Sequence, residues 1–404
     1  MTEQPTPNGH TPTLVAAFVH FDVSFMLWVL LGALGIFVAE SLRLTPSQKG
    51  LVVAVPILSG SLLRIPLGAA SDRFGAKRVG LASLAFLFLP LLLGWQFGNS
   101  LPRLLAIGLM LGSAGASFAV ALPLASRWYP PERQGLVLGI AAAGNGGTVI
   151  ANLAAPRLAT HYGWPTVLAL ATIPLAAALA AFALLAREAP GRRPARGRGV
   201  YREVSGTTDL WWYCAFYGVT FGGYVGLSGF LPLFLRDQYA VTPVTAGALT
   251  ALAAVVGSGL RPVGGWLADR LGGTRLLATL LGGAALAYAA LGALPPLTVA
   301  VPVLTLGMAC LGMGNGAVFQ LVPQSFRARI GVATGIVGAL GGVGGFALPL
   351  LLGAMKQATG SFALGFSVLA AVAATALVAL RAVFAPRIGA RLRHAPPAAE
   401  GSPA

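Results

Sequence analysis

Two stretches of sixteen residues decide the fold: residues 60–75 read GSLLRIPLGAASDRFG and residues 257–272 read GSGLRPVGGWLADRLG. They align without a gap at a constant offset of 197 residues and are identical at eight positions. The shared positions are Gly60, Ser61, Leu63, Arg64, Gly68, Asp72, Arg73 and Gly75 in the first copy, and Gly257, Ser258, Leu260, Arg261, Gly265, Asp269, Arg270 and Gly272 in the second. Such self-similarity indicates that the chain consists of two equivalent halves.

The composition indicates a membrane protein. Of the 404 residues, 56% are hydrophobic and 9% are charged, whereas a soluble domain usually carries about 25% charged residues. A membrane-spanning helix needs about 20 mostly apolar residues, and apolar stretches fill nearly the whole chain. The 54 glycines suit a bilayer, where small residues let helix backbones approach closely. We therefore expect the lipid bilayer to solvate the chain.

Six apolar stretches lie on each side of a polar, arginine-rich segment. Those before it cover 14–40, 47–70, 78–97, 101–128, 134–158 and 164–186, and those after it cover 209–235, 243–268, 274–294, 298–325, 330–355 and 361–384. The sequence therefore predicts an all-α polytopic membrane protein with twelve transmembrane helices. Its predicted divisions are a cytoplasmic N-terminal tail (1–13), an N-terminal half (14–186), a cytoplasmic linker (187–208), a C-terminal half (209–384) and a disordered cytoplasmic tail (385–404).

Lysine and arginine are distributed unevenly over the predicted loops. With the N-terminus inside, the cytoplasmic segments hold 19 of them and the outer segments hold six. Cytoplasmic loops carry the excess of basic residues, so both termini and the linker are expected in the cytoplasm, at a bacterial inner membrane. The net charge of +16 then faces anionic lipid headgroups, and no nucleic acid is expected as a partner.

The two remaining basic residues, Arg64 and Arg261, fall inside apolar stretches. An arginine near the bilayer centre costs about 2.5–3.5 kcal/mol on insertion scales, so both need a reason. Each lies eight residues from the aspartate of its repeat, Asp72 or Asp269, which places it roughly 12 Å inside the membrane. The repeat brings the two guanidinium groups to equivalent positions on opposite walls of one cavity.

Protein carboxylates are too few to neutralise both arginines. Only Asp22 and Glu40 lie where they could approach the hydrocarbon region. We therefore expect the transported substrate to be the missing counter-charge. A guanidinium presents its donors as a planar fork, which suits a planar oxyanion bound through two oxygens. Without an anion, such a site holds two positive charges that repel each other. The carrier would therefore close readily only with a monoanion bound, which favours the exchange of one anion for another.

The repeated segment resembles the loop signature of the major facilitator superfamily. Its pattern Gly-x-x-x-Asp-Arg-x-Gly occurs after the second and the eighth stretches, where that superfamily has it. The resemblance implies two six-helix halves related by pseudo-two-fold symmetry, with the substrate between them near the midplane. It also implies a structural role at the helix ends for Gly68, Asp72, Arg73, Gly75, Gly265, Asp269, Arg270 and Gly272, the alternative being that the aspartates are only solvated.

Glycine-rich runs in the fifth and eleventh stretches narrow the resemblance. GIAAAGNGGTVIA covers 139–151 and TGIVGALGGVGGFALP covers 334–349, and the pair is similar to the nitrate signatures of the nitrate/nitrite porter family. That resemblance implies a transporter of nitrate and nitrite that needs no cofactor or metal and is not an enzyme. It implies a substrate site made by Arg64, Arg261, Tyr217, Phe118, Phe221, Asn145, Gly144, Gly341 and Asn315.

The sequence leaves alternatives open for the mode of coupling and for the substrate. Asp22, His20 and Glu40 in the first stretch are candidates for proton relay, as in symporters, so proton symport and nitrate/nitrite exchange both stand. Asp22 could instead be a structural hydrogen-bonding residue. Another small monoanion, such as formate or oxalate, is the alternative substrate, although paired aromatic residues indicate a narrow cavity. A single subunit is expected to be the working unit.

Overall fold

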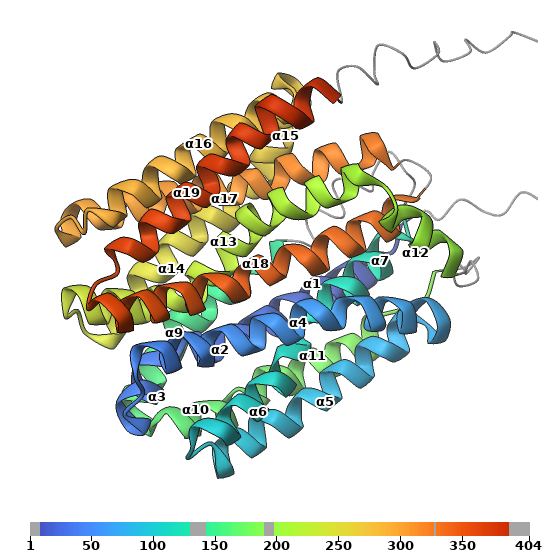
Figure 1. Cartoon of the computed structure of the whole chain (residues 1–404). Helices are drawn as coiled ribbons and strands as arrows, with labels where there is room; N and C mark the ends of the chain where they lie inside the picture. Colours follow the sequence, from blue (N-terminus) through green and yellow to red (C-terminus); the bar gives the residue numbers. More distant parts are fainter. Residues whose placement is uncertain (1–8, 130–142, 190–197, 327–328, 388–404) are drawn as a thin grey trace, which may run out of the picture.

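The computed structural model describes residues 9–129, 143–189, 198–326 and 329–387, and none of these residues forms a strand. Their helices run roughly side by side along one direction (Figure 1). Those drawn in blue to green, from the first part of the chain, form one group, and those drawn in yellow-green (α13) to red form the other. The two groups correspond to the two predicted halves.

The first group contains five spans and part of a sixth. The first span is broken into α1 (Thr11–Trp28), α2 (Leu30–Ala33) and α3 (Gly35–Leu42). The next two are single helices, α4 (Pro46–Phe74) and α5 (Ala76–Phe97). The fourth consists of α6 (Leu101–Leu111), the 3₁₀ turn η1 (Gly112–Ser117) and α7 (Phe118–Ser126). After it come η2 (Ala143–Gly146), α9 (Gly147–Tyr162), α10 (Trp164–Leu170) and α11 (Thr172–Leu185).

The second group repeats this order of spans. A short helix, α12 (Arg198–Ser205), lies in the predicted linker and leads into α13 (Thr208–Tyr239). The second span is divided into α14 (Pro243–Gly259) and α15 (Arg261–Leu271). The remaining spans are α16 (Gly273–Gly292), α17 (Leu297–Ser325), α18 (Ile330–Thr359) and α19 (Ala363–Ala379), which continues into the π turn η4 (Leu380–Phe384).

Eleven helices in the described part of the chain are long and apolar enough to cross a membrane. The fifth predicted stretch, 134–158, is the one that is not among them. Its residues 134–142 lie outside the described residues, and the rest forms η2 and the sixteen-residue α9.

The break between α14 and α15 departs from the single helix predicted for 243–268. Pro262 follows directly on Arg261, and a proline removes a backbone N–H and clashes with the carbonyl four residues earlier. The proline therefore starts a new helix, and Arg261 becomes its first residue.

Both copies of the repeat end on a glycine that the backbone requires. Gly75 ends α4 with φ 101°, and Gly272 ends α15 with φ 88°. Residues other than glycine rarely adopt positive φ, because their Cβ atom clashes with the backbone. The last glycine of the motif therefore allows the chain to leave one helix and enter the next at once, at Ala76 and Gly273.

The two halves meet along α4 and α18, which lie side by side in Figure 1. Glycines permit this close approach: a Cβ atom on Gly50 of α4 would overlap the carbonyl of Pro349 of α18. Likewise, a Cβ atom on Gly342 of α18 would overlap the hydroxyl of Ser61 of α4. Arg64 lies one turn beyond Ser61, so this contact brings it to the boundary between the halves.

Candidate functional site

Arg64 is buried at the boundary of the halves, with 3% of its surface exposed. Its Nε donates a hydrogen bond to the carbonyl of Gly115 in η1, at 3.0 Å. Its Nη1 donates to the carbonyl of Gly338 in α18, at 2.5 Å. One guanidinium group therefore holds backbone from both halves. Its third nitrogen, Nη2, is buried without a hydrogen-bond partner among the described residues.

Neither membrane arginine is neutralised by a carboxylate in the part of the chain that the structure describes. The four ion pairs found there are Lys49–Asp237, Arg127–Asp72, Arg236–Glu40 and Arg329–Glu203. A buried charge without a partner is strongly unfavourable. The unpaired Nη2 of Arg64 therefore marks a place where an anion would be stabilised.

Aromatic rings surround the Arg64 guanidinium. Its central carbon lies 5.1 Å from the ring centroid of Phe221, 5.3 Å from that of Phe118 and 5.4 Å from that of Trp28. A cation within about 6 Å of a ring centroid is attracted by the ring's quadrupole. The rings stabilise the positive charge without using the N–H groups, which remain available to oxygen acceptors.

Arg261 is half-buried and reaches the same aromatic group from the other half. Its Nη2 donates a hydrogen bond to the hydroxyl of Tyr217 at 3.4 Å, and its guanidinium lies 5.7 Å from the ring centroid of Phe319. Tyr217 and Phe221, one turn apart on α13, stack with centroids 4.9 Å apart and planes 1° apart. The Tyr217–Phe221 stack thus lies between the two arginines.

The backbone of α18 forms the adjacent surface. A Cβ atom on Gly341 would overlap the Tyr217 ring, and one on Gly338 would lie 3.6 Å from both Nη1 of Arg64 and the ring of Phe118. Because Gly338 and Gly341 have no side chains, Arg64 and the aromatic residues lie directly on the backbone of α18. The arrangement offers a small, flat anion two guanidinium groups with aromatic faces beside them.

Comparisons with known proteins show the family of this chain. The model of the Major Facilitator Superfamily matches residues 16–349. The "Nitrite extrusion protein" of Bacillus subtilis (strain 168) is 37% identical over 363 residues, covering 88% of this chain and 89% of the relative. The "Probable nitrate/nitrite transporter NarK2" of Mycobacterium tuberculosis (strain ATCC 25618 / H37Rv) is 37% identical over 353 residues, covering 86% of this chain and 89% of the relative. The chain belongs to the nitrate/nitrite porter family of the major facilitator superfamily.

A third relative and a solved structure extend the comparison. The "Probable nitrate transporter NarT" of Staphylococcus carnosus (strain TM300) is 34% identical over 372 residues, covering 88% of this porter and 92% of the relative. A bacterial homologue of the human lysosomal transporter Spinster, in an inward-facing conformation, has a TM-score of 0.75 at 19% identity, covering 98% of this chain and 100% of that one. The likeness to Spinster shows the fold alone. The predicted all-α, twelve-helix fold and the porter family are thereby confirmed.

The two predicted asparagines make no hydrogen bond with either arginine among the described residues. Asn145 lies in η2, next to Gly144, and Asn315 lies in α17. Each has 1% of its surface exposed, and the amide oxygen of each has no partner among the described residues. An unsatisfied buried amide oxygen costs free energy, so both are open to a donor.

His20 and Glu40, two of the predicted proton-coupling residues, lie apart from the arginines. His20 is fully buried between α1, α5 and α11. Its Nε2 lies 3.3 Å from the carbonyl of Gly80, and its ring packs on Phe182. Glu40 lies at the far end of the bundle, where it accepts a hydrogen bond from Arg236 at 3.1 Å.

Asp22 lies on the remaining side of α1. Its carboxylate faces the glycines that lead into α9, because a Cβ atom on Gly146 would lie 3.3 Å from Oδ1. The N-terminus of a helix favours a negative charge. This surrounding gives Asp22 a structural contact beside the turn that carries Asn145.

The duplicated motif residues gather at the opposite end of the bundle from Glu40. Asp72 pairs with Arg127, which follows α7, at 2.7 Å and so joins two helix ends. Asp269 is exposed at the end of α15. Arg73 and Arg270 lie over neighbouring rings, at 5.1 Å from Phe74 and 4.0 Å from Trp266. Gly68 and Gly265 lie where α4 and α15 pass Ala119 and Gly316.

Sequence reasoning missed four residues of the site: Trp28, Phe319, and the backbone carbonyls of Gly115 and Gly338. Phe319 lies in the tenth apolar stretch, in the run GMGNGAVFQLVPQ (312–324), and its spacing from Asn315, one helical turn, could have indicated a shared face. Its ring lies 4.8 Å from that of Tyr217 and 6.2 Å from that of Phe118. Backbone carbonyls leave no such signal in the sequence.

Proposed function

We propose that this chain is a nitrate/nitrite transporter of the bacterial inner membrane that binds its anion between Arg64 and Arg261. The names of three relatives, from Bacillus subtilis, Mycobacterium tuberculosis and Staphylococcus carnosus, support the substrate. The observation that carries the proposal is the buried, unpartnered Nη2 of Arg64 beside a site without a neutralising carboxylate among the described residues.

The chemistry of the site suits nitrate. Nitrate is planar and singly charged, so two guanidinium forks can each meet its oxygens in the plane, while aromatic faces cover the flat surface. The hydroxyl of Tyr217 already accepts a hydrogen bond from Arg261 and keeps its own proton to donate to an oxygen of the anion. Phe118, Phe221 and the surface at Gly341 limit the size of what fits.

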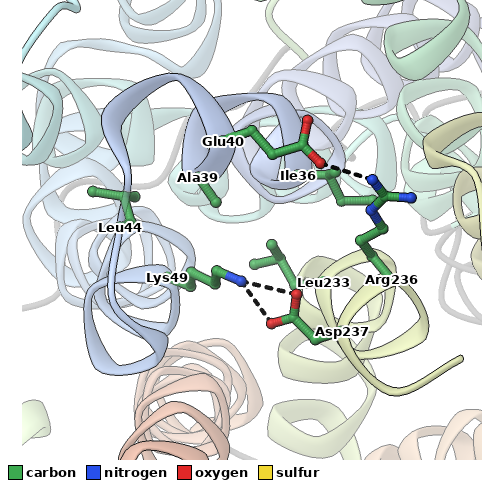
Figure 2. Close-up of a pocket in the computed structure, with 8 residues that line it drawn as sticks. All are labelled: Ile36, Ala39, Glu40, Leu44, Lys49, Leu233, Arg236 and Asp237. Atoms are coloured by element: carbon green, nitrogen blue, oxygen red, sulfur yellow. Dashed lines mark hydrogen bonds and ion pairs between the residues drawn. The ribbon is translucent and has the colours of Figure 1, made fainter. Parts of the chain in front are cut away.

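Alternating access is the proposed mode of transport, and the ion pairs support it. Figure 2 shows Lys49 and Glu40, from the first half, facing Asp237 and Arg236, from the second. Lys49 Nζ lies 2.7 Å from a carboxylate oxygen of Asp237. These pairs hold the halves together at the end of the bundle that we assign to the outer side.

The contacts at the other end have a different distribution. Asp72 and Arg127 both belong to the first half, and Glu203 of α12 pairs with Arg329, just before α18. In the described residues, the ion pairs that join the two six-helix halves directly are therefore those at the Glu40 end. A carrier held closed at one end can release its substrate at the other, which we assign to the cytoplasm together with both termini.

We propose exchange of nitrate for nitrite as the mode of coupling. With an anion absent, two cations remain near the Tyr217–Phe221 stack, and the contacts that Arg64 makes with described residues are to neutral backbone and rings. Of the three candidates for proton relay, His20 is packed elsewhere and Glu40 is ion-paired. Asp22 alone is left for symport, so the arrangement favours exchange.

Proteoliposomes containing the purified transporter test this function. Labelled nitrate outside should enter saturably when nitrite is trapped inside, and much more slowly when the vesicles hold only an impermeant buffer. Formate and oxalate in the outer medium should compete weakly. Equal uptake without internal nitrite or a proton gradient would contradict exchange, non-saturating uptake would indicate a channel, and stronger competition by formate would reassign the substrate.

A further inference from the structure

The indole of Trp28 lies beside Arg64 and Phe221 of the site. Trp28 is the last residue of α1, with 1% of its surface exposed. Its Nε1 donates a hydrogen bond to the carbonyl of Pro56 in α4 at 2.7 Å. The same ring system lies 5.4 Å from the Arg64 guanidinium carbon and stacks on Phe221 at 6.5 Å. One end of the indole is thus fixed to α4, and the ring lies against the arginine of that helix.

The surrounding backbone leaves a slot that an indole fills. A Cβ atom on Gly60 of α4 would lie 2.5 Å from Nε1 of Trp28, and one on Gly115 of η1 would overlap the ring. Gly60 lies one turn before Arg64, and helical side chains lean toward the N-terminus of their helix. The guanidinium therefore comes back toward the level of Gly60, where the indole lies.

We propose that Trp28 is a positioning residue for Arg64, which rests on the proposed function. The hydrogen bond to Pro56 fixes the orientation of the indole, and the indole stabilises the guanidinium through its face. A carboxylate in the same place would neutralise Arg64 and occupy its donors. An aromatic ring stabilises the cation while leaving the in-plane N–H groups free, so Nη2 stays available to the anion.

The alternative role for Trp28 is simple packing of α1 against α4. The two roles differ in what a substitution changes. Loss of packing lowers the amount of folded transporter and its maximal rate, whereas loss of positioning raises the KM for nitrate. A matched control is Phe25, one turn away on α1, fully buried and 5.0 Å from the Trp28 ring.

The test compares Trp28→Phe, Trp28→Leu and Phe25→Leu in nitrite-loaded proteoliposomes, with labelled nitrate as the probe. Trp28→Leu removes the ring and should raise the KM about tenfold, whereas Trp28→Phe keeps a weaker ring and should raise it about threefold. Phe25→Leu should leave the KM within twofold of the unsubstituted chain. Vmax per mole of inserted protein should change less than twofold in all three variants.

Each outcome decides the role of Trp28. An unchanged KM in Trp28→Phe and Trp28→Leu, or an equal rise in Phe25→Leu, would overturn the proposal. If Trp28→Leu does not reach the membrane, the comparison of Trp28→Phe with Phe25→Leu decides alone. Failure of the proposed function is distinguishable, since the unsubstituted chain would then show no saturable nitrate uptake.

Discussion

Replacing Arg64 by lysine should weaken nitrate binding severely while keeping the positive charge. Arg64 uses Nε and Nη1 on the carbonyls of Gly115 and Gly338, and keeps Nη2 without a partner among the described residues. A lysine has a single nitrogen and cannot hold both carbonyls and still present a planar fork to the anion. At least one charge-assisted hydrogen bond is lost.

The magnitude follows from that count. A hydrogen bond to a charged group contributes about 1.5–3 kcal/mol, which corresponds to roughly 10- to 150-fold in affinity. We expect Arg64→Lys to raise the KM for nitrate by at least tenfold, measured as initial rates of labelled nitrate uptake into nitrite-loaded proteoliposomes. The control is Arg73→Lys, an exposed arginine at the end of the same helix, which should leave the KM unchanged. A KM within threefold of the unsubstituted value in Arg64→Lys would refute the reasoning.

Three further predictions concern the boundary of the halves and the coupling. Lys49→Asp places two carboxylates opposite each other and should slow exchange roughly 3- to 10-fold, because like charges at an interface repel. Adding Asp237→Lys should restore the pair and most of the rate. Gly341→Ala should raise the KM for nitrate about tenfold, because its Cβ overlaps the Tyr217 ring and overpacking costs about 1–3 kcal/mol. Asp22→Asn should leave the pH dependence of nitrate exchange unchanged.

The controls for these predictions come from the same elements. At Gly335 on α18, the structure places no described atom outside the local helix backbone within 4 Å of a new Cβ, so Gly335→Ala should leave nitrate uptake unchanged. An inactive Lys49→Asp that the second charge does not rescue would count against the ion-pair role. A pH profile that flattens in Asp22→Asn would restore proton symport as the coupling.

The features that could be predicted from the sequence are those that carry a high free-energy cost in a membrane or in the backbone. Arg64 and Arg261 stand out because a charge within an apolar stretch demands a reason. The repeat between residues 60–75 and 257–272 fixed their equivalence. Gly75 and Gly272 were predictable as chain turns, since positive φ favours glycine.

The remaining features could not be predicted, because the sequence does not show which way a helix faces. His20 and Asp22 are two residues apart and equally ionisable, yet His20 packs on Phe182 and Asp22 faces Gly146. In the sequence, Trp28 looks like any apolar residue inside the predicted first stretch, 14–40. Its contact with Arg64 depends on glycines of two other elements, and no spacing within α1 reveals it.

The most direct test of the central claim is a double-mutant cycle of nitrate affinity. Isothermal titration with purified transporter would compare the unsubstituted chain, Arg64→Lys, Arg261→Lys and the double variant. If both arginines hold one anion, the second substitution should cost little after the first, with a coupling free energy of about 1 kcal/mol or more. Losses that simply add, or a single variant that binds nitrate normally, would contradict a shared anion.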